Sequence, residues 1–421
     1  MVVEDRKIKK QIYAPAHEVL GYFPPGWGDV ALAEANQVLT NLCWAGKHKP
    51  QVSLREDHIL IENIDFRSML ELPFRMTTFR EFFWVLLRNR ATGIGDIKKS
   101  WDKIPWDLLF DKSETVGLVV DSKSSRLFHE NMLKDCITDR FLSSDYIVKP
   151  LEEAKQRVSL TLRRNQLVVG LGLGGQPLYQ RGYKTSLCGV ATMAEHVAQC
   201  LLRSHRLWLG QNIDVSQMNR STFVPFAGSG TFGFESIILD HQLPLFLWRR
   251  RWAFLSWRCV PKASISWLKE QLQKPLATAA GFNQVAMLEL EADHVKSIEA
   301  NICSFSNFPG FNQLYGMQVT QGDFFEWESL SEDGLLQCYM NPPWGLRIKA
   351  QGRRNSFYLE LAHKLISVAE RRKGPTSGFC LMITESDWRD FMGPLKKFKL
   401  HTRHFSSGGK DVRVVNYLYT A

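Results

Sequence analysis

The chain has 421 residues, with 53 Lys and Arg against 43 Asp and Glu, and a formal charge of +10 at neutral pH. That length corresponds to two or three domains of about 150 residues. A hydrophobic content of 44% excludes a disordered or fibrous chain. The sequence has no apolar run long enough to span a bilayer and no apolar segment behind its first charges, as a secretory signal would have. We therefore expect no membrane partner.

The eight cysteines form no Cys-x-x-Cys pair and stand at no zinc-ligand spacing with histidine. They are also too few for a disulfide scaffold. We therefore expect no bound metal and a reducing, cytoplasmic setting. Nothing in the pattern indicates the oligomeric state.

The positive charge is distributed unevenly along the chain. Residues 1–150 carry 21 basic and 21 acidic side chains, so the whole excess lies in residues 151–421. A positive balance permits an anionic partner such as nucleic acid, although charge alone does not identify one. This distribution predicts a neutral N-terminal part and a basic C-terminal part.

The first part of the chain mixes short strands with amphipathic helices. A Pro-Pro-Gly turn precedes a predicted helix over 29–42. Residues 79–87 have the pattern of a buried helix, residues 116–121 that of a strand, and residues 129–141 that of a helix with one apolar face. This mixture favours one or two small α+β units.

Strands and helices alternate more regularly in the second part. We predict strands at 221–228, 283–291, 316–323, 334–343 and 378–386, and helices at 294–302 and 356–372. Such alternation predicts an α/β, Rossmann-like domain with a doubly wound parallel sheet. Two last strands flank the segment Ser406-Ser407-Gly408-Gly409, so we expect the sheet to end in an antiparallel hairpin.

Open parallel sheets bind their ligands beyond the carboxyl ends of the strands. One such end is a glycine-rich turn that comprises Phe226, Ala227, Gly228, Ser229, Gly230 and Thr231. Its two glycines let a ligand approach the backbone. The next two ends carry Glu289, which can accept both hydroxyls of a ribose, and Asp323, which can accept the amino group of an adenine. Each alone is compatible with an ordinary turn, but together they predict a site for an adenosine-bearing cofactor.

A fourth strand end carries the candidate catalytic residues Asn341, Pro342, Pro343 and Trp344. The two prolines make the chain rigid and remove two N–H donors. The Asn341 side-chain oxygen and the Pro342 carbonyl can then accept both hydrogens of a planar exocyclic amine, while Trp344 stacks on its base. This arrangement needs no strong base and no metal. It suits methyl transfer from S-adenosylmethionine, in which positioning does most of the work.

Another glycine pattern, formed by Gly170, Gly172 and Gly175, fits the dinucleotide fingerprint G-x-G-x-x-G. That fingerprint requires a helix to begin there. The residues that follow have no helical period, so we predict no dinucleotide site.

Two basic and aromatic segments have the composition of RNA-contacting surfaces. The first contains Arg181, Tyr183 and Lys184, and the second runs from Trp248 to Arg258. For the second segment, a structural interpretation is the alternative to RNA contact. In that interpretation it is a helical insertion that buries its tryptophans and leaves its arginines in solvent.

The motifs, in this order, resemble those of the THUMP-domain RNA methyltransferases, above all the enzymes that methylate guanine N2 in large-subunit ribosomal RNA. The resemblance covers nearly the whole chain. It rests on the segments FPPGWGDVALAEANQVL, DSKSSRLFHENMLKDCITDRF, GGQPLYQRGYK, PFAGSGTFGFES and NPPWGLRI. The Arg-Gly-Tyr and Asn-Pro-Pro motifs are the specific ones, and the THUMP match is looser.

The resemblance implies three regions. Residues 1–155 would form a ferredoxin-like and THUMP module that binds structured RNA, residues 156–190 a linker, and residues 191–421 a class I methyltransferase domain that modifies the N2 amine of a guanine in ribosomal or transfer RNA. It also implies that Glu235 takes part in cofactor binding and that Arg347, like the basic residues of the linker, contacts RNA.

Three positions depart from the family pattern. Val224 stands where an aspartate usually precedes the cofactor loop, residues 186–190 replace a Lys-Glu pair, and Trp344 replaces a tyrosine. The first two lie where the family handles the methionine part of the cofactor, so they leave open an RNA-binding protein with a degenerate methyltransferase domain. A second alternative is adenine-N6 methylation of nucleic acid, which shares the Asn-Pro-Pro-aromatic motif.

Overall fold

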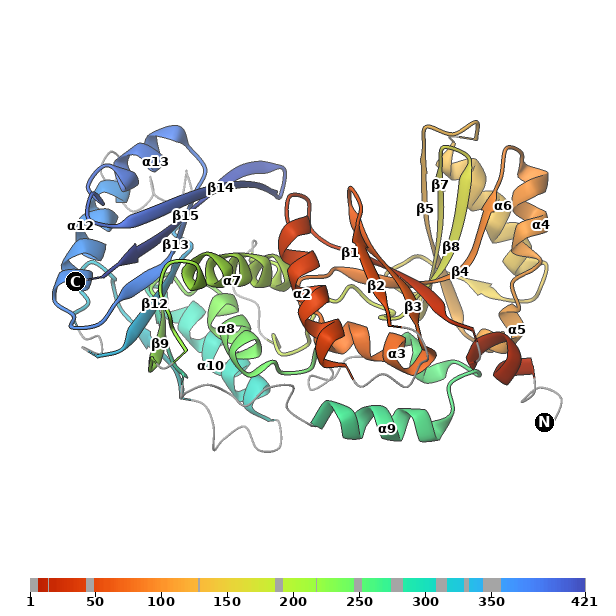
Figure 1. Cartoon of the computed structure of the whole chain (residues 1–421), viewed down its shortest axis with the longest axis horizontal. Coiled ribbons are helices and arrows are strands. Elements are labelled where there is room, and N and C mark those ends of the chain that lie inside the picture. Colours follow the sequence, from red (N-terminus) through yellow and green to blue (C-terminus); the bar gives the residue numbers. More distant parts are fainter. Residues whose placement is uncertain are drawn as a thin grey trace. The chain divides into compact units, whose positions relative to one another are not determined.

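The computed structural model describes most of the chain, namely residues 7–13, 15–42, 49–127, 129–185, 192–216, 218–245, 252–273, 283–307, 316–328, 333–343 and 357–420. The chain forms two compact units, each drawn from several segments (Figure 1). Unit 1 comprises Met1–Pro24, Gly28–Gln180 and Arg249–Lys274, and unit 2 comprises Pro25–Trp27, Arg181–Trp248 and Pro275–Ala421. Across the stretches that the model describes, no helix is both long and apolar enough to cross a membrane.

Unit 1 is built on an eight-stranded sheet with the order β2-β3-β1-β4-β8-β7-β5-β6. Its strands are β1 (His17–Tyr22), β2 (Gln51–Leu54), β3 (His58–Ile64), β4 (Glu81–Arg90), β5 (Thr115–Lys123), β6 (Ile147–Val148), β7 (Gln156–Arg163) and β8 (Gln166–Gly172). Its α-helices are α2 (Gly28–Asn41), α3 (Phe66–Arg75), α4 (Ile94–Trp101), α5 (Trp106–Leu109), α6 (Glu130–Leu142) and α9 (Lys262–Gln273). The predicted helices at 29–42 and 129–141 and the predicted strand at 116–121 are therefore confirmed.

The buried helix predicted at 79–87 is wrong, because these residues belong to β4. This strand lies between β1 and β8 and pairs antiparallel with both. Phe82, Phe83 and Trp84 follow one another in it, and all three are buried. A strand that is buried on both faces has no polar alternation, so periodicity does not distinguish it from a buried helix. The aromatic run, which favours strands, was the available indication.

Residues 156–172 form β7 and β8, although the resemblance implies a linker over 156–190. The two strands are joined by Arg164 and Asn165, which both have positive φ angles, 51° and 61°. Such a two-residue turn is typical of a tight hairpin. Gly170 and Gly172 lie within β8, and no helix follows in the described residues up to 185, as expected for a chain without a dinucleotide fingerprint there.

The connection from α8 (Thr231–His241) to β10 (Asn283–Glu289) contributes residues 249–274 to unit 1. Trp252 packs edge-on against Phe74, with ring centroids 4.2 Å apart. Trp257 donates from Nε1 to Gln156 Oε1 at 2.9 Å. Both tryptophans are buried, which confirms the structural interpretation for these two residues. Trp248 and the three arginines after it lie outside the described residues.

Because residues 151–180 and 249–274 belong to unit 1, the charge of the two folded units differs from the charge of the two parts of the sequence. Unit 1 carries 32 basic and 24 acidic side chains, and unit 2 carries 21 and 19. The prediction of a neutral N-terminal part is therefore wrong for the folded units. The net positive charge of unit 1 comes from residues 151–180, which include the hairpin, and from the inserted segment 249–274, and both stand in the second part of the sequence.

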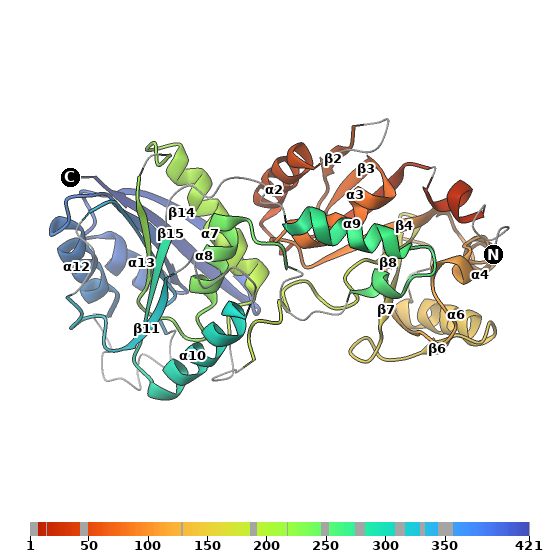
Figure 2. The ribbon, with the colours of Figure 1, turned by 90° about the horizontal axis from the view of Figure 1, so that it is seen from below.

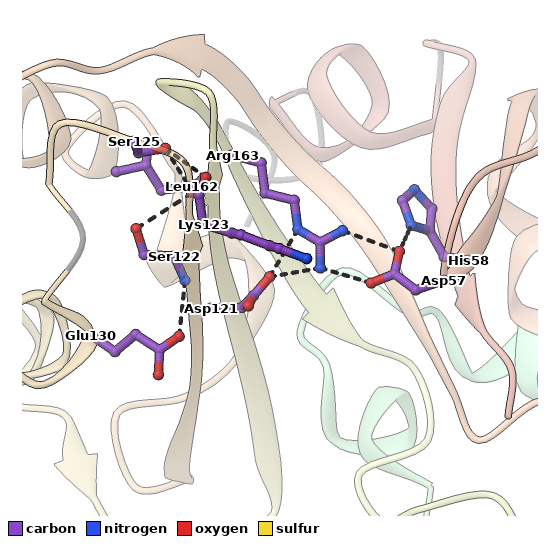
Figure 3. A network of polar contacts seen from close by, with 9 residues as sticks. All are labelled: Asp57, His58, Asp121, Ser122, Lys123, Ser125, Glu130, Leu162 and Arg163. Carbon is purple, nitrogen blue, oxygen red and sulfur yellow. Dashed lines mark hydrogen bonds and ion pairs between the residues drawn. The ribbon is translucent and has the colours of Figure 1, made fainter. Parts of the chain in front are cut away.

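A polar network holds the unit 1 sheet together across several strands (Figure 3). Arg163 at the end of β7 binds both carboxylate oxygens of Asp57, at 3.2 and 2.7 Å, and donates to Asp121 on β5 at 2.9 Å. Partial burial raises the pKa of Asp57, but the hydrogen bonds from Arg163 and His58 outweigh it and hold that pKa below its ordinary value. Asp57 precedes β3, and β1, β4 and β8 lie between β3 and β7 in the strand order. The ion pair therefore bridges distant strands of the curved sheet.

Unit 2 is built on a seven-stranded sheet with the order β11-β10-β9-β12-β13-β15-β14. Its strands are β9 (Arg220–Val224), β10 (Asn283–Glu289), β11 (Met317–Gln321), β12 (Leu335–Met340), β13 (Thr376–Met382), β14 (Lys399–Ser407) and β15 (Lys410–Tyr419). The strands from β9 to β13 pair in parallel, and β15 pairs antiparallel with β13 and β14. The turn glycines Gly408 and Gly409 have φ angles of 58° and 75°. The doubly wound sheet with a final antiparallel hairpin is thus confirmed.

Helices cover both faces of this sheet (Figures 1 and 2). One face carries α7 (Glu195–Gly210), α8 (Thr231–His241) and α10 (Ala292–Ser306), and the other carries α12 (Phe357–Glu370) and α13 (Glu385–Met392). The predicted helices at 294–302 and 356–372 are confirmed as α10 and α12. A core of apolar residues from α12, β12, β13 and β15 fixes the second face. The parallel strands bring their carboxyl ends to the same end of the sheet, which is where open α/β sheets bind ligands.

Candidate active site

The four segments singled out in the sequence lie at one edge of the unit 2 sheet. The strands β11, β10, β9 and β12 are neighbours and run in parallel. The glycine-rich turn follows β9, Glu289 ends β10, Asp323 follows β11, and Asn341 follows β12. The strand order reverses between β9 and β12, which is the switch point where open α/β sheets bind ligands.

The two glycines of the turn have different roles. Gly228 and Gly230 both have left-handed backbones, with φ angles of 56° and 77°. A Cβ at Gly230 would stand 2.7 Å from Phe234 Cε2, so this glycine is required for close packing at the start of α8. At Gly228 no described atom lies within 4 Å of the position of a Cβ. The backbone at Gly228 therefore leaves room for a ligand.

The other residues of the turn shape it from within. Ser229 and Thr231 are buried, and their hydroxyl oxygens lie 3.0 Å apart. Ala227 is also buried, and its N–H donates to the Leu288 carbonyl at 3.0 Å. Phe226 is half-buried and packs on Phe324, with ring centroids 5.8 Å apart. Contacts from this turn to a ligand would therefore come mainly from its backbone.

Glu289 is held against the glycine-rich turn. One carboxylate oxygen accepts the N–H of Gly228 at 2.7 Å, and the other accepts the N–H groups of the next two residues at 3.0 and 3.2 Å. The side chain is thus fixed at the end of β10 beside the open position of Gly228. Asp323 stands at the neighbouring strand end, where its Oδ1 accepts the Phe325 N–H at 2.9 Å.

Asn341 has the most informative side chain of the site. Its Oδ1 atom is buried and has no hydrogen-bond partner among the described residues. An unsatisfied buried acceptor costs on the order of 1–3 kcal/mol, so such an atom at a strand end points to a ligand that donates to it. Pro342 is buried and Pro343 half-buried beside it. Trp344 and Arg347, which were predicted to stack on a base and to contact RNA, lie outside the described residues.

The structure corrects the roles predicted for four residues. Arg181 and Glu235 are completely enclosed, with the Arg181 Nε atom 3.4 Å from Glu235 Oε1. The Tyr183 hydroxyl donates to the same oxygen at 2.8 Å. Lys184 forms an ion pair with Glu195 at 3.1 Å, and both of these side chains are largely buried. These side chains are enclosed or largely buried within unit 2, so none of them presents a surface to RNA.

Burial and the neighbouring carboxylates act in opposite directions on the pKa of Arg181. Burial lowers the pKa of Arg181, but the carboxylates of Glu235 and Glu195 outweigh it and raise that pKa. Burial raises the pKa of Tyr183 well above its ordinary value. Arg181 therefore stays charged and Tyr183 stays a hydrogen-bond donor throughout the physiological range. No periodicity indicates this pairing, because its partners stand 54 positions apart in the sequence.

Within the described stretches, no three His, Cys, Asp or Glu side chains gather in a way that could hold a metal ion. Val224, which replaces the usual aspartate, is fully buried at the end of β9. It offers no polar atom to the site.

Comparisons with known sequences reveal distant relatives. No family model matches the chain. The chain is 24% identical over 340 residues to the ribosomal RNA large subunit methyltransferase K/L of Shewanella pealeana, an alignment that covers 78% of this chain and 44% of the relative. It is 26% identical over 319 residues to the protein of the same name from Hydrogenovibrio crunogenus, with 71% and 41% covered. The chain thus spans less than half the length of these curated relatives.

Solved structures match over nearly the whole chain. A protein described as a methyltransferase in complex with SAH superimposes with a TM-score of 0.72 at 15% identity and covers 96% of this chain and 98% of its own. A predicted N6-adenine-specific DNA methylase from Listeria monocytogenes gives 0.70 at 15% identity, with 97% of each chain covered. TrmN from Thermus thermophilus gives 0.63 at 16% identity, with 96% and 100% covered.

These similarities agree with the strand order and with the position of the open strand ends. The chain has the class I methyltransferase fold preceded by a second unit, and it resembles the ribosomal RNA large subunit methyltransferases K/L in sequence.

Proposed function

We propose that this chain is an S-adenosylmethionine-dependent RNA methyltransferase that methylates the exocyclic N2 amine of a guanine, with ribosomal RNA as its substrate. The observation that carries the proposal is the buried Oδ1 of Asn341, which lacks a hydrogen-bond partner among the described residues at the end of β12. An exocyclic amine supplies the missing donor.

The proposed chemistry depends on orientation. Asn341 Oδ1 and the Pro342 carbonyl oxygen accept the two hydrogens of the amine, which turns its nitrogen lone pair out of the base plane. Trp344 stacks on the base and holds it in place. S-adenosylmethionine supplies a methyl group on a sulfonium, so the amine needs no strong base. The S–CH3 bond would break as the N–C bond forms, which would leave the neutral sulfide of S-adenosylhomocysteine, and the extra proton on the methylated amine would pass to water.

The residues at the other strand ends fit the cofactor. The open backbone position at Gly228 leaves room for its amino acid part. Glu289, which is fixed beside Gly228, is the proposed acceptor of the ribose hydroxyls. Asp323 at the end of β11 is the candidate partner of the adenine amino group. The buried Val224 offers no hydrogen bond, so we expect weaker binding of the cofactor than an aspartate at this position would allow.

RNA is the proposed partner for two reasons. The curated relatives are named as ribosomal RNA methyltransferases. Unit 1 also carries eight more basic than acidic side chains, which suits attraction to phosphates. We place the activity in the cytoplasm, as the cysteine pattern predicts.

The proposal is tested with the purified chain, ribosomal RNA from cells that lack its gene, and S-adenosylmethionine carrying a labelled methyl group. The RNA is then digested to nucleosides and analysed by mass spectrometry. We expect the label in N2-methylguanosine. Unlabelled RNA, together with SAH binding that calorimetry does not detect at millimolar concentration, would favour an RNA-binding protein with a degenerate methyltransferase domain.

Adenine N6 is the second candidate target. An acceptor such as Asn341 Oδ1 fits either exocyclic amine, and the Listeria monocytogenes neighbour is described as an adenine-specific methylase. The same digestion separates the two, because label in N6-methyladenosine would identify this alternative.

A further inference from the structure

The segment Arg181–Thr185 contacts three helices of unit 2. It stands directly after the last residue of unit 1, Gln180, and before residues 186–191, which lie outside the described part. Side chains of the segment reach α8 and α7, and the Thr185 backbone N–H reaches α10; these three helices together cover one face of the sheet. We call these five residues the clamp.

The contact with α8 is made through a buried charge. Arg181 approaches Glu235 through two nitrogens, Nε and Nη2, each 3.4 Å from a different carboxylate oxygen. The Tyr183 hydroxyl donates to Glu235 Oε1 at 2.8 Å. Glu235 lies one turn into α8, directly after the glycine-rich turn, so these bonds fix the first turn of that helix.

An aromatic contact connects the clamp to the glycine-rich turn. The ring centroid of Tyr183 lies 4.9 Å from that of Phe234. The edge of Phe234 in turn lies under Gly230, at 2.7 Å from where a Cβ would stand. A single ring therefore separates Tyr183 from the turn that would bind the cofactor. Interiors are close-packed, so a shift of Phe234 is transmitted to Gly230.

The clamp is anchored to the neighbouring helices as well. The backbone N–H of Thr185 donates to Asn301 Oδ1 on α10 at 2.8 Å, and Asn301 is fully buried. Lys184 Nζ lies 3.1 Å from Glu195 Oε1 at the start of α7. Gly228 lies just before α8, and Glu289 lies just before α10. The clamp therefore contacts both helices that begin next to the Gly228–Glu289 hydrogen bond.

We propose that Arg181 and Tyr183 are positioning residues for the cofactor site. Through Glu235 and Phe234 they hold the glycine-rich turn in the conformation in which Gly228 meets Glu289. A loop that adopts its binding conformation only part of the time binds its ligand more weakly by that fraction. This inference rests on the proposed function, since it concerns the same cofactor.

A purely structural role makes a different prediction. If the clamp only stabilises unit 2, removing one of its hydrogen bonds lowers the melting temperature and leaves the affinity of the folded protein for the cofactor unchanged. If it positions the loop, affinity falls in protein that remains folded. The two roles are separated by measuring affinity below the melting temperature.

The test uses the full chain and the variant Tyr183→Phe, which removes the hydroxyl and keeps the ring on Phe234. The matched control is Tyr417→Phe. Tyr417 is also fully buried, and its hydroxyl donates to the Cys338 carbonyl at 2.6 Å on the far side of the core from α8. For each protein the dissociation constant of SAH is measured by calorimetry, the melting temperature by circular dichroism, and KM and kcat by methyl transfer.

We expect Tyr183→Phe to weaken SAH binding about tenfold, as for a lost hydrogen bond to a charged group. KM for S-adenosylmethionine should rise by a similar factor, with kcat unchanged at saturation. Tyr417→Phe should lower the melting temperature and leave SAH affinity within twofold of wild type. A second variant, Arg181→Lys, keeps the charge and loses the two-nitrogen contact, and we expect it to weaken binding as well.

Wild-type SAH affinity in both clamp variants would overturn this inference while leaving the proposed function intact. Equal loss of affinity in Tyr183→Phe and Tyr417→Phe would also overturn it, because the effect would then be general. Absence of SAH binding by the wild-type chain would overturn the proposed function, and the clamp with it.

Discussion

The two units differ in how the chain builds them and in the charge that they carry. Unit 2 is a regular succession of strands and helices and is nearly neutral, with 21 basic against 19 acidic side chains. Unit 1 takes a hairpin from the expected linker and a segment from within the α8-to-β10 connection, and it carries 32 against 24. The net positive charge therefore belongs mainly with unit 1, although the residues that create this excess all stand beyond residue 150.

The largest expected effect tests whether the inserted segment belongs to unit 1. Trp257→Ala removes a buried ring that donates to Gln156 on β7. We expect it to destabilise unit 1 by about 3–5 kcal/mol. Hydrogen exchange should become faster in β4, β7 and β8 and stay unchanged in β9 to β13. The control Phe379→Ala, on β13, should show the reverse. Faster exchange in unit 2 for Trp257→Ala would break the division.

The next effect concerns the acid stability of unit 2. Burial lowers the pKa of His205 to about 4, and the ring lies between Asn416 and Ser377. The unfolded chain takes up a proton near pH 6.5 and the folded one does not, so stability present above pH 6.5 is lost as the pH falls toward 4. We expect a loss of about 2 kcal/mol between pH 7 and pH 5. Burial also lowers the pKa of His241 to about 4, so in denaturant titrations His205→Gln should remove its own share of the dependence and leave that of His241. An unchanged dependence in His205→Gln would count against the prediction.

A third prediction tests the charge difference directly. The exposed cations Arg258, Lys262 and Lys269 of the inserted segment are replaced together by glutamine. If they attract RNA phosphates, the slope of log affinity against log salt should become shallower by about 2–3. The control replaces three exposed lysines of unit 2, namely Lys396, Lys399 and Lys410. Equal changes in both variants would show that the charge of unit 1 has no special role.

The smallest effect concerns the bridge across the unit 1 sheet. Asp57→Asn removes one carboxylate from Arg163, and both side chains are partly exposed (Figure 3). We expect a loss of at most about 1 kcal/mol at neutral pH. The pKa of Asp57 lies below its ordinary value of 3.8, so its contribution is present above that pH and is lost as the pH falls further. Wild type and variant should thus become equal in strong acid.

The two units also differ in how much of their fold could be predicted from the sequence. The strands β9, β10, β12 and β13 are each followed by a helix as the next described element, and Gly408-Gly409 indicates the hairpin, so the fold of unit 2 and the four strand ends follow from local patterns. Local patterns were insufficient in unit 1. The β4 residues are buried on both faces and lack alternation, and the position of residues 249–274 depends on contacts with β7 and α3 that are distant in sequence.

The site shows the same division. That Gly228, Glu289 and Asn341 lie at the same end of the sheet was predictable, because the carboxyl ends of parallel strands converge. Arg181 and Glu235 were given the wrong partners, because a basic residue in a glycine-rich segment has the same pattern whether it faces RNA or a buried carboxylate. Only the fold brings such a pair together.

The central claim is tested most directly by Asn341→Ala, measured in single-turnover methyl transfer and in SAH calorimetry. The control is Asn219→Ala, an exposed asparagine before β9 at the opposite edge of the same sheet. We predict that Asn341→Ala lowers the rate at least about 100-fold and leaves SAH affinity within twofold, while Asn219→Ala has wild-type values in both assays. A wild-type rate in Asn341→Ala would contradict the assignment of Asn341 as the acceptor of the target amine.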